Sequence, residues 1–520
     1  MQLTGRNIIG YETFSEGTVA FQAQNPTTGE TLAPLFFKAT LDELSLAVEK
    51  AESAFQIYRK KSGVEKAQFL EAIATEIEAL GDDLLSRYHA ETGLPLARAT
   101  GERGRTTGQL RLFASILREG SWVNARIDTA LPDRQPLPRP DLRSMERPIG
   151  PVGVFGASNF PLAFSVAGGD TTSALAAGCP VVFKAHPAHP GTSELVGLAI
   201  QKAAKDTNMP DGVFSLVFDD GHEIGQALVK HPSIKAIGFT GSYRGGKALF
   251  DAAAARPEPI PVYAEMGSVN PVFVLPDAMK ERSTAIAQNY VASVTMGVGQ
   301  FCTNPGMLLL EKNDGFMTEL EQQIANASGG VMLTDGIQRA YQKGIEHFGG
   351  KMNLIGKGIT PQGNTAVEPV LFKTDCESLI ANPDLAEEVF GPTSVVVEAE
   401  NSSQLIEVAK SLTGHLTATV HGTEQDLKEN AELLEILEQK VGRLLINSFP
   451  TGVEVSHAMV HGGPFPSTTD SRSTSVGTMA IYRFTRPVCY QGFPDFALPE
   501  ELKQANPLNL WRLVDGERTK

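Results

Sequence analysis

Short β-rich runs alternate with helical segments over residues 150–460 of this 520-residue chain. In the first part of that region, Val152–Phe155 and Val181–Lys184 are each followed by a segment with helical periodicity. A second block of the same kind begins near residue 264. This alternation is typical of parallel βαβ units with helices on both faces of a sheet. Because the chain is also too long for a single core, we expect an α/β protein with two doubly wound parallel-sheet domains.

Periodicity and turn residues bound the expected elements. We expect strands at Val152–Phe155, Val181–Lys184, Val213–Val217, Ile234–Thr240, Pro271–Val274, Met307–Leu310, Ser394–Val397, Ala418–Val420, Arg443–Ile446 and Ile481–Phe484. We expect helices within 41–80 and near 98–118, 161–177, 191–205, 221–229 and 245–255. Prolines are frequent in and just after 126–148 and again after 480. They predict an extended arm or edge hairpin, and a tail that pairs with this arm or with another subunit.

The chain carries 45 Lys and Arg residues against 60 Asp and Glu residues, a net charge of −15. That balance argues against nucleic acid or an anionic membrane as the main partner. The segment Met1–Gly10 has no apolar signal core, and no apolar run approaches the roughly 18 residues that span a membrane. Only four cysteines occur, so we expect no disulfide framework and a cytoplasmic protein. The histidines show no convergent ligand spacing, so we expect no metal site.

Cys302 lies in the glycine-rich segment Gly297–Gly306. A thiol held on such a loop is open to a substrate, and its backbone N–H can point at the same substrate. Thiolate is the reactive form of cysteine, and nearby hydrogen-bond donors lower the thiol pKa. The alternative is a small apolar residue in a buried turn, which is the commoner use of free cysteine.

The segment Gly238–Lys247 follows an expected strand and opens an expected helix. Free backbone N–H groups and the helix dipole converge at such a point and favour a phosphate group. The spacing also fits the start of a P-loop, but Ala248 replaces the Ser or Thr that would hold magnesium. No Gly-x-Gly-x-x-Gly motif occurs, so the standard dinucleotide fingerprint is missing too. We expect a phosphate site here, with a plain structural turn as the alternative.

Three polar side chains come at expected strand ends or turns, where α/β proteins bind their ligands. Asn159 precedes an expected helix, so its amide either caps that helix or donates to a developing oxyanion. Glu265 is either a solvated or capping residue or, beside a thiol, a base that activates water. Glu388 either binds ribose hydroxyls or caps a turn.

Taken in order, these motifs resemble the NAD(P)-dependent aldehyde dehydrogenase superfamily over nearly the whole chain. The matching motifs are Asn159-Phe-Pro, Lys184, Phe-Thr-Gly-Ser242, Glu265-x-Gly, Gly-Gln-x-Cys302, Glu388-x-Phe-Gly-Pro and Gly442-x-x-x-x-Asn447. The resemblance implies that Cys302 attacks an aldehyde, that Asn159 and the Cys302 N–H hold the oxyanion, and that Glu265 activates the hydrolytic water. It also implies cofactor contacts from Phe155, Ser158, Lys184, His186, Gly241, Ser242, Gly246, Gly267, Glu388 and Phe390.

Departures from the family pattern bear on the cofactor. Ser158 stands where the family usually has Trp, and Ala185-His186-Pro187 replaces a Pro-Ser-Glu whose carboxylate binds the adenosine ribose. Loss of that carboxylate removes repulsion against a 2′-phosphate, and Lys184 remains as its partner. Gly245 replaces a bulkier residue near the adenine. We therefore expect NADP to be used well or preferred, with NAD as a possible cofactor.

Longer phrases resemble one branch, which holds the alpha-ketoglutaric semialdehyde (2,5-dioxopentanoate) dehydrogenases and an NADP-dependent long-chain aldehyde dehydrogenase. In that branch a C-terminal histidine lies near the nucleophile, and His461 is the matching position, with an ordinary surface histidine as the alternative. A dicarboxylate semialdehyde needs a cation in the substrate tunnel, and the flanking helix offers Arg103, Arg105, Arg111 and Arg118. We select Arg111 and Arg118, which are seven residues apart and share a face.

We therefore expect oxidation of 2,5-dioxopentanoate, with a long-chain aldehyde as the alternative substrate. A CoA-acylating enzyme is disfavoured by Glu265, and a catalytically silent homologue by the retained motifs. The resemblance implies an NAD(P)-binding domain at 1–125 and 149–263, and a catalytic domain at 264–478. It assigns 126–148 and 479–520 to an oligomerisation arm and tail, which suggest a homodimer or a tetramer.

Overall fold

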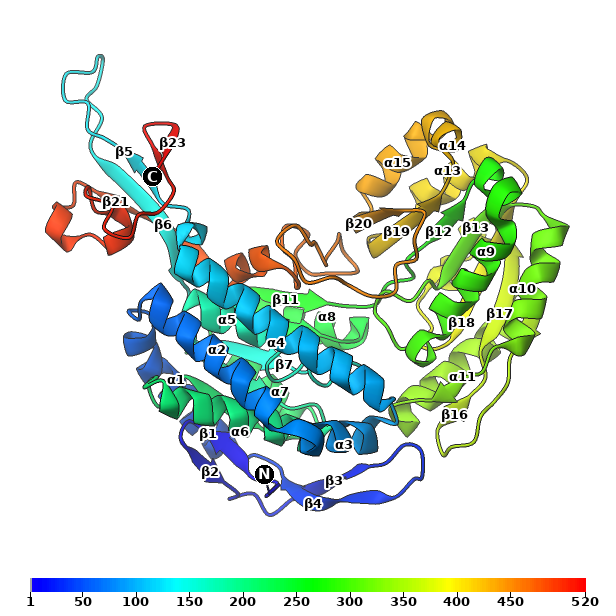
Figure 1. The fold of residues 1–520 in the computed structure, drawn as a ribbon, viewed down its shortest axis with the longest axis horizontal. Helices are drawn as coiled ribbons and strands as arrows, with labels where there is room; N and C mark the ends of the chain where they lie inside the picture. The colour runs from blue at the N-terminus through cyan, green and yellow to red at the C-terminus, as the bar shows by residue number, and fades with distance from the viewer. Residues whose placement is uncertain (1) are drawn as a thin grey trace.

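The computed structural model describes residues 2–520, and Figure 1 shows two lobes with an arm that extends away from them. The first lobe is built on a seven-stranded sheet of order β11-β10-β7-β8-β9-β1-β2. Its strands are β1 Asn7–Ile9, β2 Glu12–Phe14, β7 Val152–Phe155, β8 Val181–Lys184, β9 Phe214–Val217, β10 Ala236–Thr240 and β11 Val262–Glu265. The five strands from β7 to β11 pair in parallel, while β1 and β2 close one edge in antiparallel pairing.

The second lobe repeats this plan with the order β15-β17-β18-β13-β12-β19-β20. Its strands are β12 Val272–Val274, β13 Met307–Glu311, β15 Asn353–Lys357, β17 Val370–Asp375, β18 Thr393–Ala399, β19 His415–His421 and β20 Val441–Ile446. Only β15 runs antiparallel to its neighbour. The predicted α/β class, with two parallel-sheet domains, is thus confirmed. Two small antiparallel pairs complete the lobes: β3 Ala20–Gln24 with β4 Thr31–Phe37, and β14 Gly330–Val331 with β16 Ala366–Val367.

Helices cover both faces of each sheet (Figure 1). Those of the first lobe are α1 Leu41–Tyr58, α2 Gly63–Ala79, α3 Gly81–Thr92, α4 Leu96–Glu119, α5 Gly169–Ala177, α6 Pro190–Asp206, α7 Glu223–Lys230 and α8 Tyr243–Ala254. Those of the second are α9 Pro276–Thr295, α10 Asp314–Asn326, α11 Asp335–Gly349, α12 Cys376–Ala381, α13 Ser402–Ser411, α14 Glu424–Glu429 and α15 Ala431–Glu438. Capping boxes fix the starts of α1 and α2, through Thr40 with Glu43 and Ser62 with Glu65.

The helix predicted near 161–177 begins only at Gly169, and residues 161–168 form buried turns instead. The reason is a tertiary contact with α4. One carboxylate oxygen of Glu102 accepts hydrogen bonds from the backbone N–H groups of Leu162 (2.8 Å) and Ala163 (2.9 Å). These buried donors are satisfied without a helix, so helical periodicity did not decide the conformation.

The arm is a five-stranded sheet of order β21-β6-β5-β22-β23. Its strands are β5 Arg126–Asp128, β6 Leu142–Pro148, β21 Thr485–Gln491, β22 Arg512–Val514 and β23 Glu517–Thr519. The tail therefore pairs with the arm of its own chain. The strand predicted at Ile481–Phe484 is wrong, since Thr478–Phe484 is a 3₁₀ helix. Its three-residue period buries both Ile481 and Phe484.

Within residues 2–520, no helix combines the length and the apolar character that crossing a membrane requires.

Candidate active site

Cys302 follows α9 on a tight loop between the two lobes. Gly297, Val298 and Gly299 have positive φ angles of 57°, 61° and 64°. A Cβ atom on Gly299 would lie 2.2 Å from the carbonyl group of Gly391, so only glycine permits this close approach. The Asn270 side chain donates a hydrogen bond to the carbonyl of Cys302 (2.8 Å). The backbone around the thiol is therefore fixed from two sides.

Three side chains that are far apart in the sequence meet at the thiol. The Cys302 Sγ atom lies 3.4 Å from Nε2 of His461, and the same nitrogen lies 2.8 Å from Oε1 of Glu265. The other oxygen of Glu265 accepts a hydrogen bond from the Ser475 hydroxyl (2.7 Å). His461 and Glu265 are only 1% and 4% exposed. The structure thus brings Cys302, His461 and Glu265 together, and sequence reasoning missed Ser475.

The surroundings shift the pKa values of Cys302 and Glu265 in opposite directions. Burial of the thiol and the neighbouring Glu265 carboxylate raise the pKa of Cys302 well above its ordinary value. Burial alone would raise the pKa of Glu265, but His461, Ser475 and Cys302 outweigh it, so this pKa is lowered. Both shifts favour a protonated thiol beside an ionised carboxylate, and the ionised form of Glu265 is the one that can accept a proton from water.

Asn159 lies next to the nucleophile loop, beyond the carboxyl end of β7. Its side-chain amide donates a hydrogen bond to the carbonyl of Gln300 (3.1 Å), two residues before Cys302. The backbone carbonyl of Asn159 accepts a hydrogen bond from the Arg98 guanidinium (2.8 Å). An amide has two N–H donors, so the contact with Gln300 leaves a second N–H for an oxyanion. No motif or spacing in the sequence pointed to Arg98.

The N-terminus of α8 forms a cradle of small residues. Ser242 caps the helix by accepting a hydrogen bond from the Gly245 N–H (3.2 Å). A Cβ atom added to Gly241 would lie 2.7 Å from the Phe239 ring. One added to Gly246 would lie 2.7 Å from the Met266 side chain. The glycines therefore let the start of α8 pack closely on Phe239 and Met266. The backbone N–H groups at such a helix start fit a pyrophosphate.

Lys184, at the carboxyl end of β8, donates a hydrogen bond to the backbone carbonyl of Asp219 (2.6 Å). The carboxylates of Asp219 and Asp220 lie close enough to oppose the lowering of the Lys184 pKa by burial. One Asp219 oxygen is buried without a hydrogen-bond partner among the described residues. An unpartnered acceptor beside a lysine fits a ribose hydroxyl. Sequence reasoning missed both aspartates, since they follow β9 on a different part of the chain.

His186 lines a hollow of about 290 Å³ that also borders Leu333 and Thr334 of the second lobe. Its ring stacks on the ring of His189 (5.5 Å between centroids). Burial, His189 and Lys184 lower the pKa of His186 well below its ordinary value. The ring is therefore neutral at physiological pH and supplies no charge to a cofactor phosphate.

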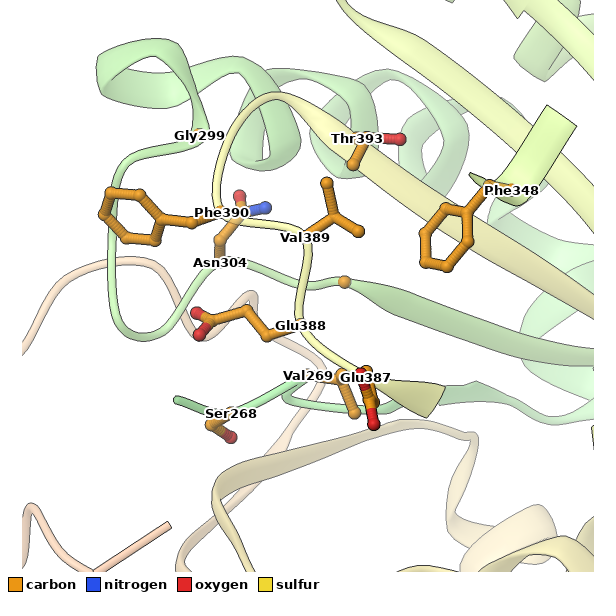
Figure 2. Close-up of a pocket in the computed structure, with 11 residues that line it drawn as sticks. Ser268, Val269, Gly299, Asn304, Phe348, Glu387, Glu388, Val389, Phe390 and Thr393 are labelled. Atoms are coloured by element: carbon orange, nitrogen blue, oxygen red, sulfur yellow. The ribbon is translucent and has the colours of Figure 1, made fainter. Parts of the chain in front are cut away.

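Figure 2 shows a second pocket, whose wall includes Ser268, Asn304, Glu388 and Phe390. Glu388 is open to this pocket, and partial desolvation by the pocket wall raises the pKa of its carboxyl group, opposed by a hydrogen bond from the Ser268 backbone. A Cβ atom at Gly267 would lie 2.3 Å from a Glu388 carboxylate oxygen. Glycine at 267 therefore gives this carboxylate its place, where it can accept hydrogen bonds from ribose hydroxyls.

Two predicted cofactor residues lie at or just after the end of β7. Phe155 is buried and makes an edge contact with Phe239 (6.2 Å between centroids), so it supports the glycine cradle from below. Ser158 is partly buried, one residue before Asn159.

The structure contradicts the prediction that Arg111 and Arg118 bind the substrate. Arg111 forms a two-bonded ion pair with Glu78, at 2.6 and 2.7 Å, and Arg118 pairs in the same way with Glu71. Both arginines are exposed, with side chains 45% and 40% accessible. These ion pairs join α4 to the outer face of α2. The face of α4 that carries Arg111 and Arg118 is therefore exposed to solvent.

Ligand atoms of Glu265, Cys302 and His461 all lie within 4.8 Å of one another, a convergence that a metal ion would also need. Sequence spacing alone did not reveal it. The expectation that the chain holds no metal therefore stays a prediction.

Comparison with known proteins places this site in a family. The model of the aldehyde dehydrogenase family matches residues 14–486. The chain belongs to the aldehyde dehydrogenase family. It is 52% identical to alpha-ketoglutaric semialdehyde dehydrogenase 2 of Azospirillum brasilense, over 99% of this chain and 100% of that protein. It is 49% identical to alpha-ketoglutaric semialdehyde dehydrogenase of Acinetobacter baylyi, over 99% of each chain.

Solved structures agree with the family at the level of the fold. The aldehyde dehydrogenase KauB of Pseudomonas aeruginosa superposes with a TM-score of 0.80 at 21% identity, covering 94% of this chain and 97% of that one. A putative aldehyde dehydrogenase of Burkholderia cenocepacia gives 0.79 at 21% identity, covering 94% and 99%. Aldehyde dehydrogenases use NAD(P)+, which agrees with the α8 cradle and the acceptors Glu388 and Asp219.

Proposed function

We propose that this aldehyde dehydrogenase oxidises 2,5-dioxopentanoate to 2-oxoglutarate. The observation that carries the proposal is the full-length identity of 52% and 49% to two alpha-ketoglutaric semialdehyde dehydrogenases. The grouping of Cys302, His461 and Glu265 supports the chemistry, because it holds a nucleophile and a base within contact distance. In the net reaction the aldehyde, one water and NAD(P)+ give the carboxylate, NAD(P)H and two protons.

The first step joins Cys302 to the substrate. Its thiol proton leaves by way of the adjacent His461 Nε2 to solvent as the Cys302 Sγ bonds to the aldehyde carbon, giving a thiohemiacetal and leaving Glu265 ionised. The oxygen carries negative charge during the attack, and the free N–H of Asn159 with the backbone N–H of Cys302 stabilises it. Such a donor typically contributes on the order of 10²–10³ in rate.

A nicotinamide held by the cofactor-binding residues would supply the hydride acceptor needed to oxidise the thiohemiacetal to a thioester on Cys302. Glu265 then takes a proton from water, which attacks the thioester carbon and releases the carboxylate and the thiol. Ser475 holds the second oxygen of Glu265 and so orients the carboxylate for this step. The residues that hold the cofactor in this proposal are those of the α8 cradle, together with Lys184, Asp219 and Glu388.

For the cofactor, Lys184 favours a 2′-phosphate, whereas Asp219 and Asp220 favour a ribose hydroxyl. We therefore propose that NADP is used well or preferred and that NAD is also accepted, with the specificity constant for NAD at most about tenfold that for NADP. A larger preference for NAD would contradict the use of NADP. The exposed arm supports a homodimer, or a tetramer made of two such dimers.

The test is formation of reduced cofactor with 2,5-dioxopentanoate and with a long-chain aldehyde, each with NADP and with NAD. We expect the specificity constant for 2,5-dioxopentanoate to be at least ten times that for the long-chain aldehyde. The Cys302→Ala variant should be inactive and should keep the melting temperature of the unaltered enzyme. Preference for the long-chain aldehyde would replace the proposed substrate. Turnover by Cys302→Ala would refute the mechanism.

A further inference from the structure

Helix α4 presents arginines on two different faces. Arg98 and Arg105 are seven residues apart and therefore share a face, since an α-helix has 3.6 residues per turn. Arg111 comes six residues after Arg105, which turns it by about 120° away from that face. The outer face carries the ion-paired arginines described above. The inner face carries Arg98 and Arg105 toward the segment that follows β7.

Arg105 lies over two aromatic rings, one beside His461 and the other beside Phe301. Its guanidinium carbon is 5.8 Å from the centroid of Phe160 and 5.1 Å from that of Phe164. The Phe164 ring in turn lies 5.9 Å from the ring of His461. The Phe160 ring lies 5.2 Å from that of Phe301, the residue before the nucleophile. One ring therefore separates this cation from the catalytic group.

The Arg105 side chain is largely withdrawn from water but not neutralised. Its Nε atom is buried without a hydrogen-bond partner within residues 2–520. Burial lowers its pKa, and Glu102, Cys302, Glu265 and Glu454 oppose that change without forming a hydrogen bond to it. Glu102, which opposes the change most, already accepts hydrogen bonds from the N–H groups of Leu162 and Ala163. An arginine stays charged under such conditions, so its guanidinium has unused donors.

A second guanidinium borders the same space. Arg443, on β20, donates to the carbonyls of Pro450 (2.7 Å) and Gly452 (3.1 Å), while its Nε atom is buried without a partner among the described residues. Burial lowers its pKa, the Cys302 thiol opposes this, and the charge of Arg105 adds to it. The two arginines therefore lie within electrostatic reach of each other and of the nucleophile, although they come from different lobes.

Apolar side chains lie beside these cations. They form one cluster with members from both lobes: Ala157, Phe160, Ala163, Phe164, Phe301, Val453, Val455, Met459 and Val476. Such surroundings strengthen an ion pair with a ligand and disfavour a bare cation. Two guanidinium groups at the edge of an apolar cluster thus make a site for an anionic group on a short carbon chain.

We propose that Arg105, with Arg443 beside it, binds the carboxylate and 2-oxo oxygens of the substrate while the aldehyde carbon lies at Cys302. This inference rests on the proposed function and names the part of the site that selects an acidic aldehyde. Arg105 is the main anchor, because its donors are unused. Arg443 is held by two carbonyls and contributes mainly its charge.

The experiment compares three five-carbon aldehydes: 2,5-dioxopentanoate, 5-oxopentanoate, which keeps the carboxylate, and pentanal, which has neither acid nor keto group. For each acid we divide its specificity constant by that for pentanal. In Arg105→Met we expect this ratio to fall roughly 10- to 100-fold, mainly because KM for the acids rises. Arg105→Lys keeps the charge but loses the planar guanidinium group, so its ratio should lie between those of the unaltered enzyme and Arg105→Met. Arg111→Met, on the outer face of the same helix, is the matched control and should leave all three constants unchanged.

Melting temperatures show whether each variant is folded. If Arg105→Met does not fold, Arg105→Lys provides the test in its place. An unchanged ratio in the folded Arg105 variants would overturn the anchor. If the unaltered enzyme oxidised 5-oxopentanoate but not 2,5-dioxopentanoate, the proposed substrate would fail while Arg105 was still tested. An equal loss for pentanal and for both acids would also contradict the anchor, since it would indicate a structural role.

Discussion

At the scale of single residues, the catalytic thiol is protonated at rest. A raised pKa means that below this value the thiolate fraction of Cys302 grows about tenfold per pH unit. We therefore expect alkylation of Cys302 by iodoacetamide in the cofactor-free enzyme to accelerate about tenfold per unit between pH 7 and pH 9 without a plateau. Site-specific mass spectrometry measures this rate and separates Cys302 from the exposed Cys489.

The same experiment isolates the contribution of Glu265. Its charge raises the pKa of the Cys302 thiol, so Glu265→Gln should lower that pKa and increase the alkylation rate at pH 8. A slower reaction in this variant would mean that Glu265 acts chiefly as the base for the thiol.

Hydrolysis of the thioester gives a second prediction for Glu265. If this carboxylate activates water, Glu265→Gln should release one equivalent of reduced cofactor per active site in a burst and then lose most steady-state turnover. Rapid mixing with 2,5-dioxopentanoate measures both phases. Ser475→Ala keeps the carboxylate but removes its orienting hydroxyl, so its steady rate should fall less than that of Glu265→Gln. Normal steady turnover in Glu265→Gln would exclude the proposed role.

At the scale of elements, Glu102 joins α4 to the buried turns that carry Phe160 and Phe164. Its carboxylate accepts the N–H groups of Leu162 and Ala163 and the Tyr88 hydroxyl. Glu102→Ala leaves these donors without a partner, which should lower the free energy of unfolding by about 2–4 kcal/mol.

Chemical denaturation measures this difference, and Glu78→Ala is the matched control. Glu78 pairs with Arg111 on the exposed side of the same helix pair, and exposed ion pairs contribute at most about 1 kcal/mol. Similar losses in the two variants would contradict the structural role of Glu102.

At the scale of the whole molecule, the arm leaves an edge strand unpaired. β21 is the last strand of its five-stranded sheet, and the next segment exposes Phe493 and Phe496, which are 47% and 85% accessible. Exposed edges and apolar patches are normally covered. We therefore expect light scattering to give at least twice the mass of one chain.

Phe496→Asp should weaken this assembly, since it places a charge on the apolar surface beside the arm. Ile57→Asp, at an exposed apolar position on α1, is the control and should not. A monomeric unaltered protein would refute the homodimer.

Much of this molecule follows from the sequence alone. The alternation of β-rich runs and helices predicts both sheets, because each parallel strand needs a crossover helix in sequence order. Strands β7 and β8 coincide with their predicted ranges. The motifs that place Cys302, Glu265 and Asn159 beside strand ends or tight turns are local, so the resemblance to the family assigned them residue by residue.

Tertiary structure decided what depends on contacts between distant segments. The distance between Cys302 and His461, which are 159 residues apart in the chain, follows from the packing of the C-terminal segment on the first sheet. The same holds for Asp219 beside Lys184 and for the turns at 161–168. Among the arginines of α4, spacing identified two that share a face, but it did not show which face is buried. A helix carries its periodicity in its own sequence, whereas the surface that covers it belongs to the rest of the chain.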